Sequence, residues 1–552
     1  MSPDAPPPAA RHPSTLVLAL GASVAAAGAI AYHRTLLYFF SQDDFASLAR
    51  AAGMVPRLHG PWRYLGNQAI FDLLRPVADL HPMPYHLASL AAHLACSTLL
   101  FALLARRLSA PAALAGGVFF AVHPALFTAV YWISVIADSL ALLFALGTLA
   151  LLDREDRWRW LAVPLFALSL LSKESTLLLP AAAMAYCWGR GRRPSGAERR
   201  SAPRLDPVMI ALGVISAIYL AYFVSSAYST YFVTAGGSTP ATGSESAAYG
   251  VGIGSHLWGN FLSYAGWTAN FLLPTVQGFS DAVDPKVFGW GVGFVALWLL
   301  GLASRPLRER GWLVGGALYL CFLLPVLPLR HHTYHYYLYA PLAGAAWLVG
   351  SAVDVGWAWL TAPRRSPART SRARAGRRSA AVSREAARND AAAWLGLGVL
   401  ILLLTLNGAL LIHKNEMYPF SVPVLGAQVE LRMDPVVDRS RIAWNVYQDL
   451  KRAALPAGAS LRFWSPTAVE MGQITGRDPS VETYWERNVR NALLDGLAVR
   501  VMLPQVKSVE FVRSVRPAGD STLYAVYQVD GHLAVAWPAE VDSLRRASTP
   551  SP

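Results

Sequence analysis

The chain has 552 residues, of which 54% are hydrophobic and only 15% are charged, and its formal net charge is +14. A water-soluble protein normally carries far more charge, so this composition excludes an ordinary soluble enzyme and indicates a membrane protein. Its three cysteines lie inside apolar segments, which is typical of small buried hydrophobic residues and not of a disulfide framework. They are Cys96, Cys187 and Cys321.

Eleven apolar segments are long enough, or nearly long enough, to cross the hydrocarbon core, which takes about 20 residues. The first could be mistaken for a cleaved signal peptide, but we expect it to remain as a span because candidate catalytic residues follow it directly. The sequence therefore predicts an α-helical polytopic membrane protein. The expected spans are roughly 14–33, 86–105, 109–126, 132–152, 158–172, 175–190, 206–227, 287–304, 311–329, 338–360 and 392–412.

Basic residues in the short loops predict the orientation, because Lys and Arg are retained on the cytoplasmic side. A cytoplasmic N-terminal tail (1–13) and eleven crossings put every basic loop in the cytoplasm and residues 413–552 outside, in a plasma (inner) membrane. The arginines are not interleaved with aromatic residues on one face, so we expect no nucleic-acid partner. The basic loops are Arg106–Arg107, Arg154–Arg159, Arg190–Arg204, Arg305–Arg310 and Arg364–Arg388.

Two further segments of the transmembrane domain (14–412) are not expected to cross the membrane. The apolar stretch 256–274 is rich in aromatic and amide side chains, which predicts an interfacial helix at the level of the outer headgroups, with a re-entrant segment as the alternative. The Arg-rich cytoplasmic loop 361–391 is expected to lie along anionic lipid headgroups. Neither segment is assigned a catalytic role.

The C-terminal part (413–552) reads as a small extracytoplasmic α/β domain. Helical periodicity predicts helices at 437–454 and 482–494, and short alternating or apolar runs predict strands. No catalytic signature is present in this part, so we interpret it as a lid or an acceptor-binding accessory. The predicted strands are 460–464, 498–503, 509–512 and 522–529.

The outer loop 34–85 carries two adjacent carboxylates, Asp43 and Asp44, directly after the first span. Adjacent carboxylates repel each other, and a low dielectric raises the pKa of one of them, which suits a general base or a ligand for a cation. The alternative interpretation is an ordinary solvated loop start or helix cap.

Several passages rich in polar and aromatic residues lie at the predicted outer face. They are His59–Gln68, His81–His86 with His93, Phe119–Pro124, Ala129–Ser134, Ala137–Leu140, Leu170–Ser175 and Leu329–Pro341. These passages resemble motifs of GT-C superfamily membrane glycosyltransferases. The nearest kin are protein O-mannosyltransferases and the transmembrane O-mannosyltransferases with tetratricopeptide repeats, which this chain lacks. The resemblance covers roughly Thr35–Arg190 well and the later spans loosely, and it departs from the family where Thr128 replaces a glutamate.

This resemblance implies a GT-C type fold and a sugar donor carried on a polyprenyl phosphate. Asp43 or Asp44 would take the proton of the acceptor hydroxyl in one inverting displacement, while cations hold the departing phosphate. The acceptor is left open among protein, lipid and glycan. The implied phosphate ligands are Lys173, Arg330, His331, His332, His335 and Arg63, and further candidates for the cavity are Glu174, His86, His123, Asp138, Tyr334 and Tyr337.

Simpler interpretations stand beside these roles. Lys173 could be a plain ion-pair partner of Glu174, and Arg330 could belong to an interfacial aromatic belt. The three histidines stand at i, i+1 and i+4, which puts only two on one helix face, so no metal site is expected, with a divalent cation on Asp43 and Asp44 as the alternative. His86 and His93 could join helices by hydrogen bonds.

Two other functions remain open on the sequence alone. One is a ligase or polymerase that moves a whole lipid-linked oligosaccharide. The other is a non-enzymatic transporter or scaffold, which would predict broken spans in paired positions and would leave the outer clustering of Asp43, Lys173 and Arg330 without a cause.

Overall fold

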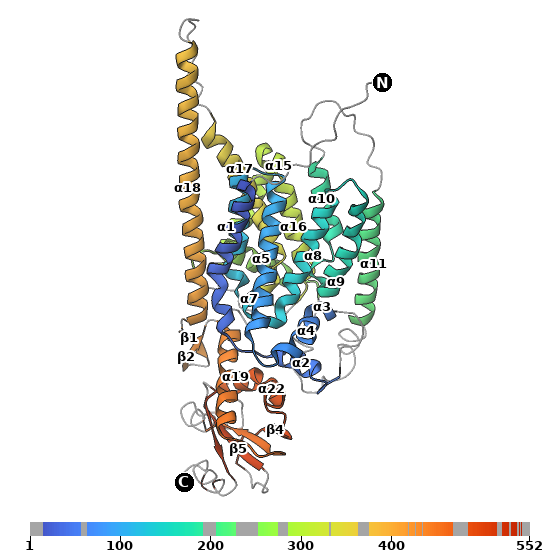
Figure 1. Ribbon diagram of the computed structural model, residues 1–552, viewed down its shortest axis with the longest axis vertical. Helices are drawn as coiled ribbons and strands as arrows, with labels where there is room; N and C mark the ends of the chain where they lie inside the picture. Colours follow the sequence, from blue (N-terminus) through green and yellow to red (C-terminus); the bar gives the residue numbers. More distant parts are fainter. Residues whose placement is uncertain are drawn as a thin grey trace.

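The computed structural model describes residues 15–56, 63–190, 206–227, 252–273, 285–329, 333–362, 375–417, 419–424, 427–432, 434–466, 484–515, 522–528, 531–537, 540 and 543. Within them a bundle of helices carries a small α/β domain at one end (Figure 1). We call this the domain end of the bundle and the opposite end the basic end.

A helix of 11 to 43 residues lies within or overlaps each of the eleven ranges predicted as spans. By length and composition, five of the described helices could cross a membrane, or six if the pair Ala110–Ala121 and Pro124–Tyr131, bent by 42°, is one span. The number of crossings therefore stays a prediction. The helices are α1 (Thr15–Tyr32), α5 (Met83–Ala105), α6 (Ala110–Ala121), α8 (Ile136–Leu152), α9 (Ala162–Ser172), α10 (Leu179–Arg190), α11 (Pro207–Ala227), α14 (Pro285–Ala303), α16 (Trp312–Leu323), α17 (Pro341–Thr361) and α18 (Ala375–Met417).

Ion pairs join neighbouring helices at the basic end. Asp153, just after α8, accepts from Arg107 at 2.8 Å and from Arg106 at 3.3 Å, both from the turn after α5. Arg310 pairs with Asp354 of α17, a carboxylate that is 1% exposed. These contacts fix the turns between the helices, so the basic residues here have a structural role in addition to any effect on orientation.

The helix α13 (His256–Ala269) lies inside the bundle. Its residues from Asn260 to Thr268 are buried, and it packs along α14, where Gly266 and Gly291 let the two backbones approach closely. A Cβ atom at Gly266 would lie 2.0 Å from the carbonyl oxygen of Val287. Protein therefore surrounds the amide and aromatic side chains between 260 and 268, which the prediction of an interfacial helix had assigned to the headgroups. Whether 256–274 is interfacial or re-entrant stays a prediction.

Short helices fill the domain end of the bundle. They belong mostly to the outer loop and to breaks between long helices. They are η1 (His33–Leu37), α2 (Asp43–Ala51), α3 (Tyr64–Asn67), α4 (Ala69–Ala78), η2 (Pro124–Leu126), α7 (Phe127–Tyr131), η3 (Ile133–Val135), η5 (Glu174–Thr176) and η7 (His335–Leu338). Of these, α2, α3 and α4 lie at the end of the bundle that faces the C-terminal domain (Figure 1). The remaining short helices, η4 (Arg157–Leu161) and α15 (Arg305–Glu309), lie at the basic end.

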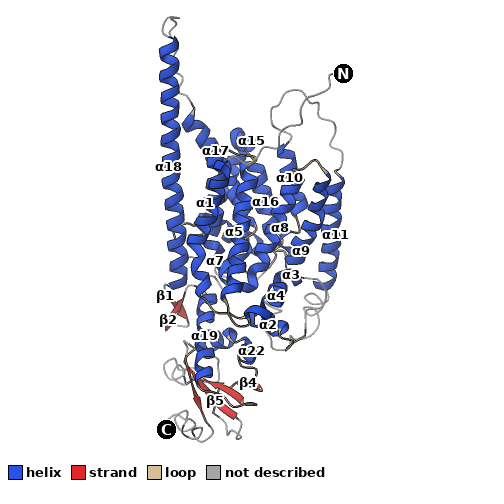
Figure 2. Cartoon of the chain, in the orientation of Figure 1, coloured by secondary structure: helices blue, strands red, loops and turns tan. Residues whose placement is uncertain are grey.

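Strands are confined to the C-terminal part of the described chain (Figure 2). A hairpin of β1 (Pro419–Val424) and β2 (Ala427–Arg432) follows α18, and a four-stranded sheet has the order β4-β3-β5-β6. In that sheet β3 is parallel to β4 and β5, and β6 is antiparallel to β5. The elements are β3 (Ser460–Trp464), β4 (Ser508–Phe511), β5 (Thr522–Tyr527), β6 (Leu533–Ala536), α19 (Pro435–Arg452), α21 (Tyr484–Ala492), η9 (Leu494–Gly496) and α22 (Leu497–Met502).

The strand predicted at 498–503 is instead the helix α22, so that prediction was wrong. A run of six apolar or mixed residues fits a helix turn as well as a strand, and periodicity alone does not distinguish them. The helix buries Ala498, Val499, Val501 and Met502. These residues belong to an apolar core whose other members come from distant parts of the chain.

That core is shared between the C-terminal domain and the outer loop. Phe40, Phe45 and Phe71 of the outer loop are 0% exposed and belong to the same apolar cluster as Val446 of α19 and Phe463 of β3. Burial of an aromatic side chain stabilises a fold by roughly 1.5–3 kcal/mol. The outer loop and the C-terminal domain therefore share one core. The outer loop is packed between the helix bundle on one side and the C-terminal domain on the other.

Polar contacts reinforce this junction. Glu416, at the end of α18 and 0% exposed, pairs with Arg34 at 2.7 Å and also accepts from the hydroxyls of Tyr38 and Tyr131. The hydroxyl of Thr128 donates to the Asp434 carboxylate at 3.0 Å, and Asp434 caps α19. At the position where the resembled family has a glutamate, this chain thus places a threonine that binds a carboxylate of its own C-terminal domain.

Candidate active site

A polar cavity of about 210 Å³ lies at the domain end of the bundle. It combines side chains from α2, from the outer loop near α3, from the start of α8, from the turn after α9 and from η7. Several residues singled out from the sequence meet here although they are far apart in the chain. The lining residues are Asp43, Ala46, Ser47, Arg50, Arg63, Asn67, Trp132, Ser134, Val135, Ala137, Asp138, Lys173, Tyr336 and Tyr337.

The two adjacent aspartates have different environments. Asp43 begins α2 and lines the cavity, whereas Asp44 is 1% exposed and accepts hydrogen bonds from the backbone N–H of Ser41 at 2.9 Å and of Ser134 at 2.8 Å. The Ser134 hydroxyl also donates to Asp44 at 2.6 Å. Asp44 thus ties the start of α2 to η3, and this contact aims Asp43 at the cavity.

Burial raises the pKa of Asp44 to about 7, although the hydrogen bonds from Ser134 and Ser41 oppose the shift. The group is therefore partly protonated near neutral pH. Its oxygens are occupied by three donors and it does not line the cavity, so its environment suits an anchor better than a base for an incoming substrate.

Asp43 shares its helix face with Arg50, seven residues further along α2, which is two helical turns. Burial lowers the pKa of the Arg50 guanidinium, and the negative charge of Asp43 partly offsets that effect. Both side chains line the cavity. The carboxylate of Asp43 and the guanidinium of Arg50 therefore line the same cavity from a single helix.

Lys173 projects into the cavity from the turn after α9 and is 8% exposed. Its ammonium group lies 2.5 Å from the carboxylate of Asp138, which is 1% exposed, and about 5 Å from two tyrosine rings. The rings are those of Tyr336 and Tyr337, at 5.0 and 4.9 Å from Nζ to the ring centroid. The simpler interpretation, in which Lys173 pairs with Glu174, does not describe this geometry.

Glu174 instead forms a two-point ion pair with Arg63, in which Nε of Arg63 donates to Oε2 at 2.9 Å. Burial alone would raise the pKa of Glu174, but the charge and hydrogen bonds of Arg63 hold it below its ordinary value. Arg63 has a left-handed backbone conformation, with φ of 50°, and lines the same cavity as Lys173. Two cations therefore reach the cavity from separate segments: Arg63 from the outer loop and Lys173 from the turn after α9.

Gly66 permits this arrangement. It lies in α3, and a Cβ atom there would be 2.4 Å from the carbonyl oxygen of Ser172 and 2.5 Å from Cβ of Ala137. Only a residue without a side chain lets the outer loop contact the ends of α8 and α9 this closely. The contact brings Arg63 to Glu174 and closes the cavity over Asp138 and Lys173.

Replacing Gly66 with alanine is therefore expected to lower the free energy of unfolding by about 1–3 kcal/mol, as overpacking does, and to weaken binding of any ligand in the cavity. Thermal unfolding of the purified protein measures the first effect. Gly213→Ala in α11 is the matched control, since a Cβ atom there meets nothing within 4 Å. Equal stability of the two variants would contradict the close packing at Gly66.

The remaining predicted site residues lie elsewhere in the bundle. His123 accepts from the backbone N–H of Ala125 and contacts the carbonyl of Thr268 at 3.1 Å, and His86 lies 3.1 Å from the hydroxyl of Thr35. His335 packs against Trp267 with ring centroids 4.0 Å apart and ring planes tilted by 54°. These three histidines are buried between helices, outside the cavity lining.

Tyr334 packs against Tyr336 and Tyr337 behind the cavity wall. Arg330, His331 and His332 lie outside the described residues. Among the described residues, no group of three or more His, Cys, Asp or Glu side chains is arranged to hold a metal ion. The predicted phosphate ligands that the structure brings together are thus Lys173 and Arg63.

Some lining residues escaped the sequence interpretation. Arg50 could have been found from its seven-residue spacing to Asp43, had a helix been predicted after the first span. Trp132 and Ser134 belong to a passage that carried the family resemblance, but nothing in the sequence placed them beside Asp43. Asn67 and Tyr336 have no sequence signal beyond their neighbours.

The fold and the cavity define a helical membrane protein with a charged, partly enclosed site at one end of its bundle. Comparison with protein-family models gave no match, and comparison with curated proteins gave none either. Among solved structures, the chain is similar to ArnT from Cupriavidus metallidurans bound to undecaprenyl phosphate. The two share 14% sequence identity over 93% of this chain and 94% of that chain, with a TM-score of 0.44.

Proposed function

We propose that this protein is a membrane glycosyltransferase of the GT-C type, which moves a sugar from a polyprenyl-phosphate donor to an acceptor hydroxyl. The observation that carries the proposal is the meeting of Asp43, Lys173 and Arg63 in one cavity. A base and two cations are what a displacement at a sugar phosphate needs. The motif resemblance described above supports the same reaction class.

In the proposed reaction, the acceptor oxygen attacks the anomeric carbon and the bond from that carbon to the phosphate oxygen breaks. The proton of the acceptor hydroxyl passes to Asp43, and the polyprenyl phosphate leaves with the electron pair. Lys173, Arg63 and Arg50 stabilise the growing charge on the phosphate, in a cavity whose partial burial strengthens each interaction. One displacement inverts the configuration of the sugar.

The size of the cavity favours transfer of a single sugar over transfer of an oligosaccharide. Its volume of about 210 Å³ gives room for about one sugar ring beside a phosphate. The cations are held in position by Asp138 and Glu174, so little ordering is required when a donor of either size binds.

We place the reaction at the outer face of the plasma (inner) membrane, with the N-terminus in the cytoplasm. The support is that the described basic turns lie at the end of the bundle opposite α2 and α3 (Figure 1), and residues of α2 and α3 line the cavity. A donor with a long polyprenyl chain would reach the cavity from the bilayer.

The proposal is tested with the purified full-length chain in phosphatidylcholine nanodiscs, given polyprenyl-phosphate hexoses and pentoses in turn. Release of polyprenyl phosphate is measured with and without a total lipid extract as the acceptor. We expect one donor class to be consumed, faster with acceptor present. Absence of turnover with every donor would overturn the proposed function and favour a scaffold.

A further inference from the structure

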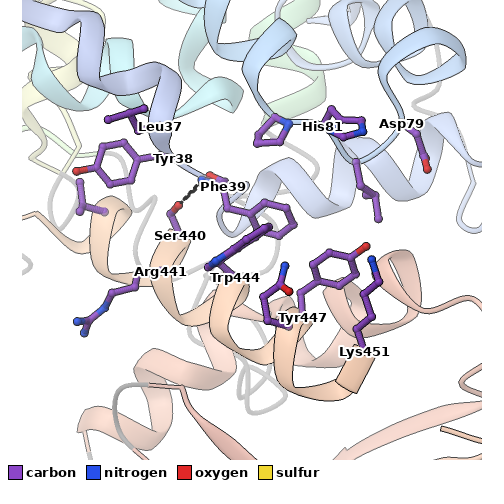
Figure 3. Close-up of a pocket in the computed structure, with 14 residues that line it drawn as sticks. Leu37, Tyr38, Phe39, Asp79, His81, Ser440, Arg441, Trp444, Tyr447 and Lys451 are labelled. Carbon is purple, nitrogen blue, oxygen red and sulfur yellow. Dashed lines mark hydrogen bonds between the residues drawn. The ribbon is translucent and has the colours of Figure 1, made fainter. Parts of the chain in front are cut away.

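A second and larger pocket, of about 650 Å³, lies between the C-terminal domain and the bundle. One face of α19 forms its floor through residues that recur every three or four positions, and the segments after α1 and α4 form the other walls (Figure 3). The lining residues are Leu37, Tyr38, Phe39, Asp79, Leu80, His81, Pro82, Val437, Ser440, Arg441, Trp444, Tyr447, Gln448 and Lys451.

Aromatic rings form a platform in this pocket. Phe39 stacks on Tyr447 with ring centroids 5.7 Å apart and meets Trp444 edge-on at 5.2 Å. Trp444 is nevertheless 44% exposed, so part of a large rigid ring faces the open pocket. Flat aromatic faces of this kind bind the apolar C–H face of a sugar ring, and rigid aromatic residues lose little conformational entropy when they do so.

Cationic groups flank the platform. Figure 3 shows Trp444 and Tyr447 between Arg441 at one end and Lys451 at the other, with His81 on the opposite wall. Ten residues of helix separate the two cations, which is about 15 Å. Asp79, the carboxylate of the lining, already pairs with Arg75 at 3.6 Å. The pocket therefore favours a ligand that combines a sugar ring with a negative charge.

The pocket also adjoins the apolar outer surface of the bundle. Leu37 lines it and is 73% exposed, and it continues an apolar surface of the first helix on which Leu18 and Ile30 are 60% and 55% exposed. If α1 crosses a bilayer, this surface faces lipid, and the pocket opens at the level of the headgroups. A ligand anchored in the membrane could place its head group here while its acyl chains remain beside α1.

One short segment connects the pocket to the candidate active site. Phe39 lines the pocket and Asp43 lines the cavity, and the four residue steps from one to the other span at most about 14 Å. Their positions are fixed from both sides, because Ser440 of α19 exchanges two hydrogen bonds of 2.9 Å with the backbone of Phe39 and Asp44 is bound to Ser134.

We propose that this pocket binds the anionic sugar head group of a membrane lipid and presents that lipid as the acceptor for transfer. The role of the lipid as an acceptor rests on the proposed function. Binding of the lipid in the pocket requires neither a donor nor turnover. It makes α19 the element that selects the acceptor, through Trp444 and Tyr447 for the ring and Lys451 and Arg441 for the charge.

The test uses the full-length protein in phosphatidylcholine nanodiscs that contain one guest lipid. Sulfatide carries a sulfated galactose, galactosylceramide is its neutral counterpart, and phosphatidylglycerol has a charge without a sugar ring. Native mass spectrometry measures how much guest lipid stays bound after release from the nanodisc. We expect sulfatide to be retained about tenfold more than either comparison lipid.

Trp444→Ala and Lys451→Ala are each expected to lower sulfatide retention by about five- to tenfold. Trp537→Ala and Lys507→Ala are matched controls, since both residues lie in the same domain, away from the pocket, and are exposed. Thermal unfolding confirms that each variant is folded. Equal losses in the control variants would overturn the assignment of the pocket.

Two further outcomes would overturn parts of the pocket assignment. Equal retention of phosphatidylglycerol and sulfatide would overturn the sugar platform, and full displacement of sulfatide by soluble galactose 3-sulfate would overturn the membrane anchor. Because no donor is present, retention is measured independently of sugar transfer. Retention of sulfatide together with no turnover in the donor assay described above would leave the pocket assignment intact and overturn only the proposed function.

Discussion

Replacing Asp43 with asparagine is expected to lower the rate of sugar transfer by about 10²–10⁴-fold, the range that removal of a general base produces. Asparagine fills nearly the same space but does not take the proton of the acceptor hydroxyl. The rate is measured as polyprenyl phosphate released per minute at saturating donor. Binding of the donor should change little, since the phosphate contacts come from Lys173 and Arg63.

Asp44→Asn is the matched control one residue away. Its expected effect falls mainly on stability, because Asp44 anchors α2 to Ser134 and does not line the cavity. Transfer by Asp44→Asn is expected to remain well above that of Asp43→Asn. If the two variants lost the same activity, or if Asp44→Asn lost more, Asp43 would not be the base.

The pH dependence separates the two aspartates further. Burial raises the pKa of Asp44 to about 7, whereas the value in the unfolded chain is about 3.9. The folded state therefore binds more protons between these values, and the contribution of Asp44 to stability is full below about pH 4 and is lost as the pH rises through 7. Asp44→Asn is expected to flatten this part of the stability profile, which unfolding at several pH values would show.

Replacing Lys173 with methionine is expected to have two separate effects. The buried carboxylate of Asp138 loses the ammonium group at 2.5 Å, and removal of one partner from a buried pair costs about 3–5 kcal/mol of stability. The leaving phosphate also loses a cation, so transfer should fall by about 10²–10³-fold. Thermal unfolding and the release assay measure these effects independently.

The double variant Lys173→Met with Asp138→Asn distinguishes the two roles. Removing the unpaired carboxylate should restore most of the stability, because no buried charge then lacks its partner. Transfer should stay low, because the cation is still missing. Recovery of both stability and transfer would show that the pair serves only the fold, and it would remove Lys173 from the proposed mechanism.

The sequence predicted the long helices and the cavity better than the details that join them. Apolar stretches of about 20 residues leave little choice of structure, so a helix occupies each predicted range. Lys173 and Asp43 were found because polar residues at the ends of apolar segments are costly and therefore stand out. The choice between Asp43 and Asp44 was not predictable, since it depends on the hydrogen bonds that Ser134 donates from another part of the chain.

Contacts between distant segments are the part of the structure that the sequence did not predict. The helix at Leu497–Met502, predicted as a strand, packs against an apolar surface supplied by the outer loop. The pocket of about 650 Å³ joins residues near position 40 to residues near position 445, and no local pattern marks that pairing. Residues 330–332, which the motif resemblance singled out, lie outside the described part of the chain.

The core that the outer loop shares with the C-terminal domain has a consequence for biosynthesis. Phe40, Phe45 and Phe71 are made early, but their partners Val446 and Phe463 emerge from the ribosome about 400 residues later. Contacts of such long sequence separation form slowly, and exposed apolar surface invites aggregation in the meantime. The loop that holds Asp43 therefore completes its core only after the C-terminal domain has been translated. A chain released before that point is expected to be inserted in the membrane without a folded outer loop, and so without the proposed activity.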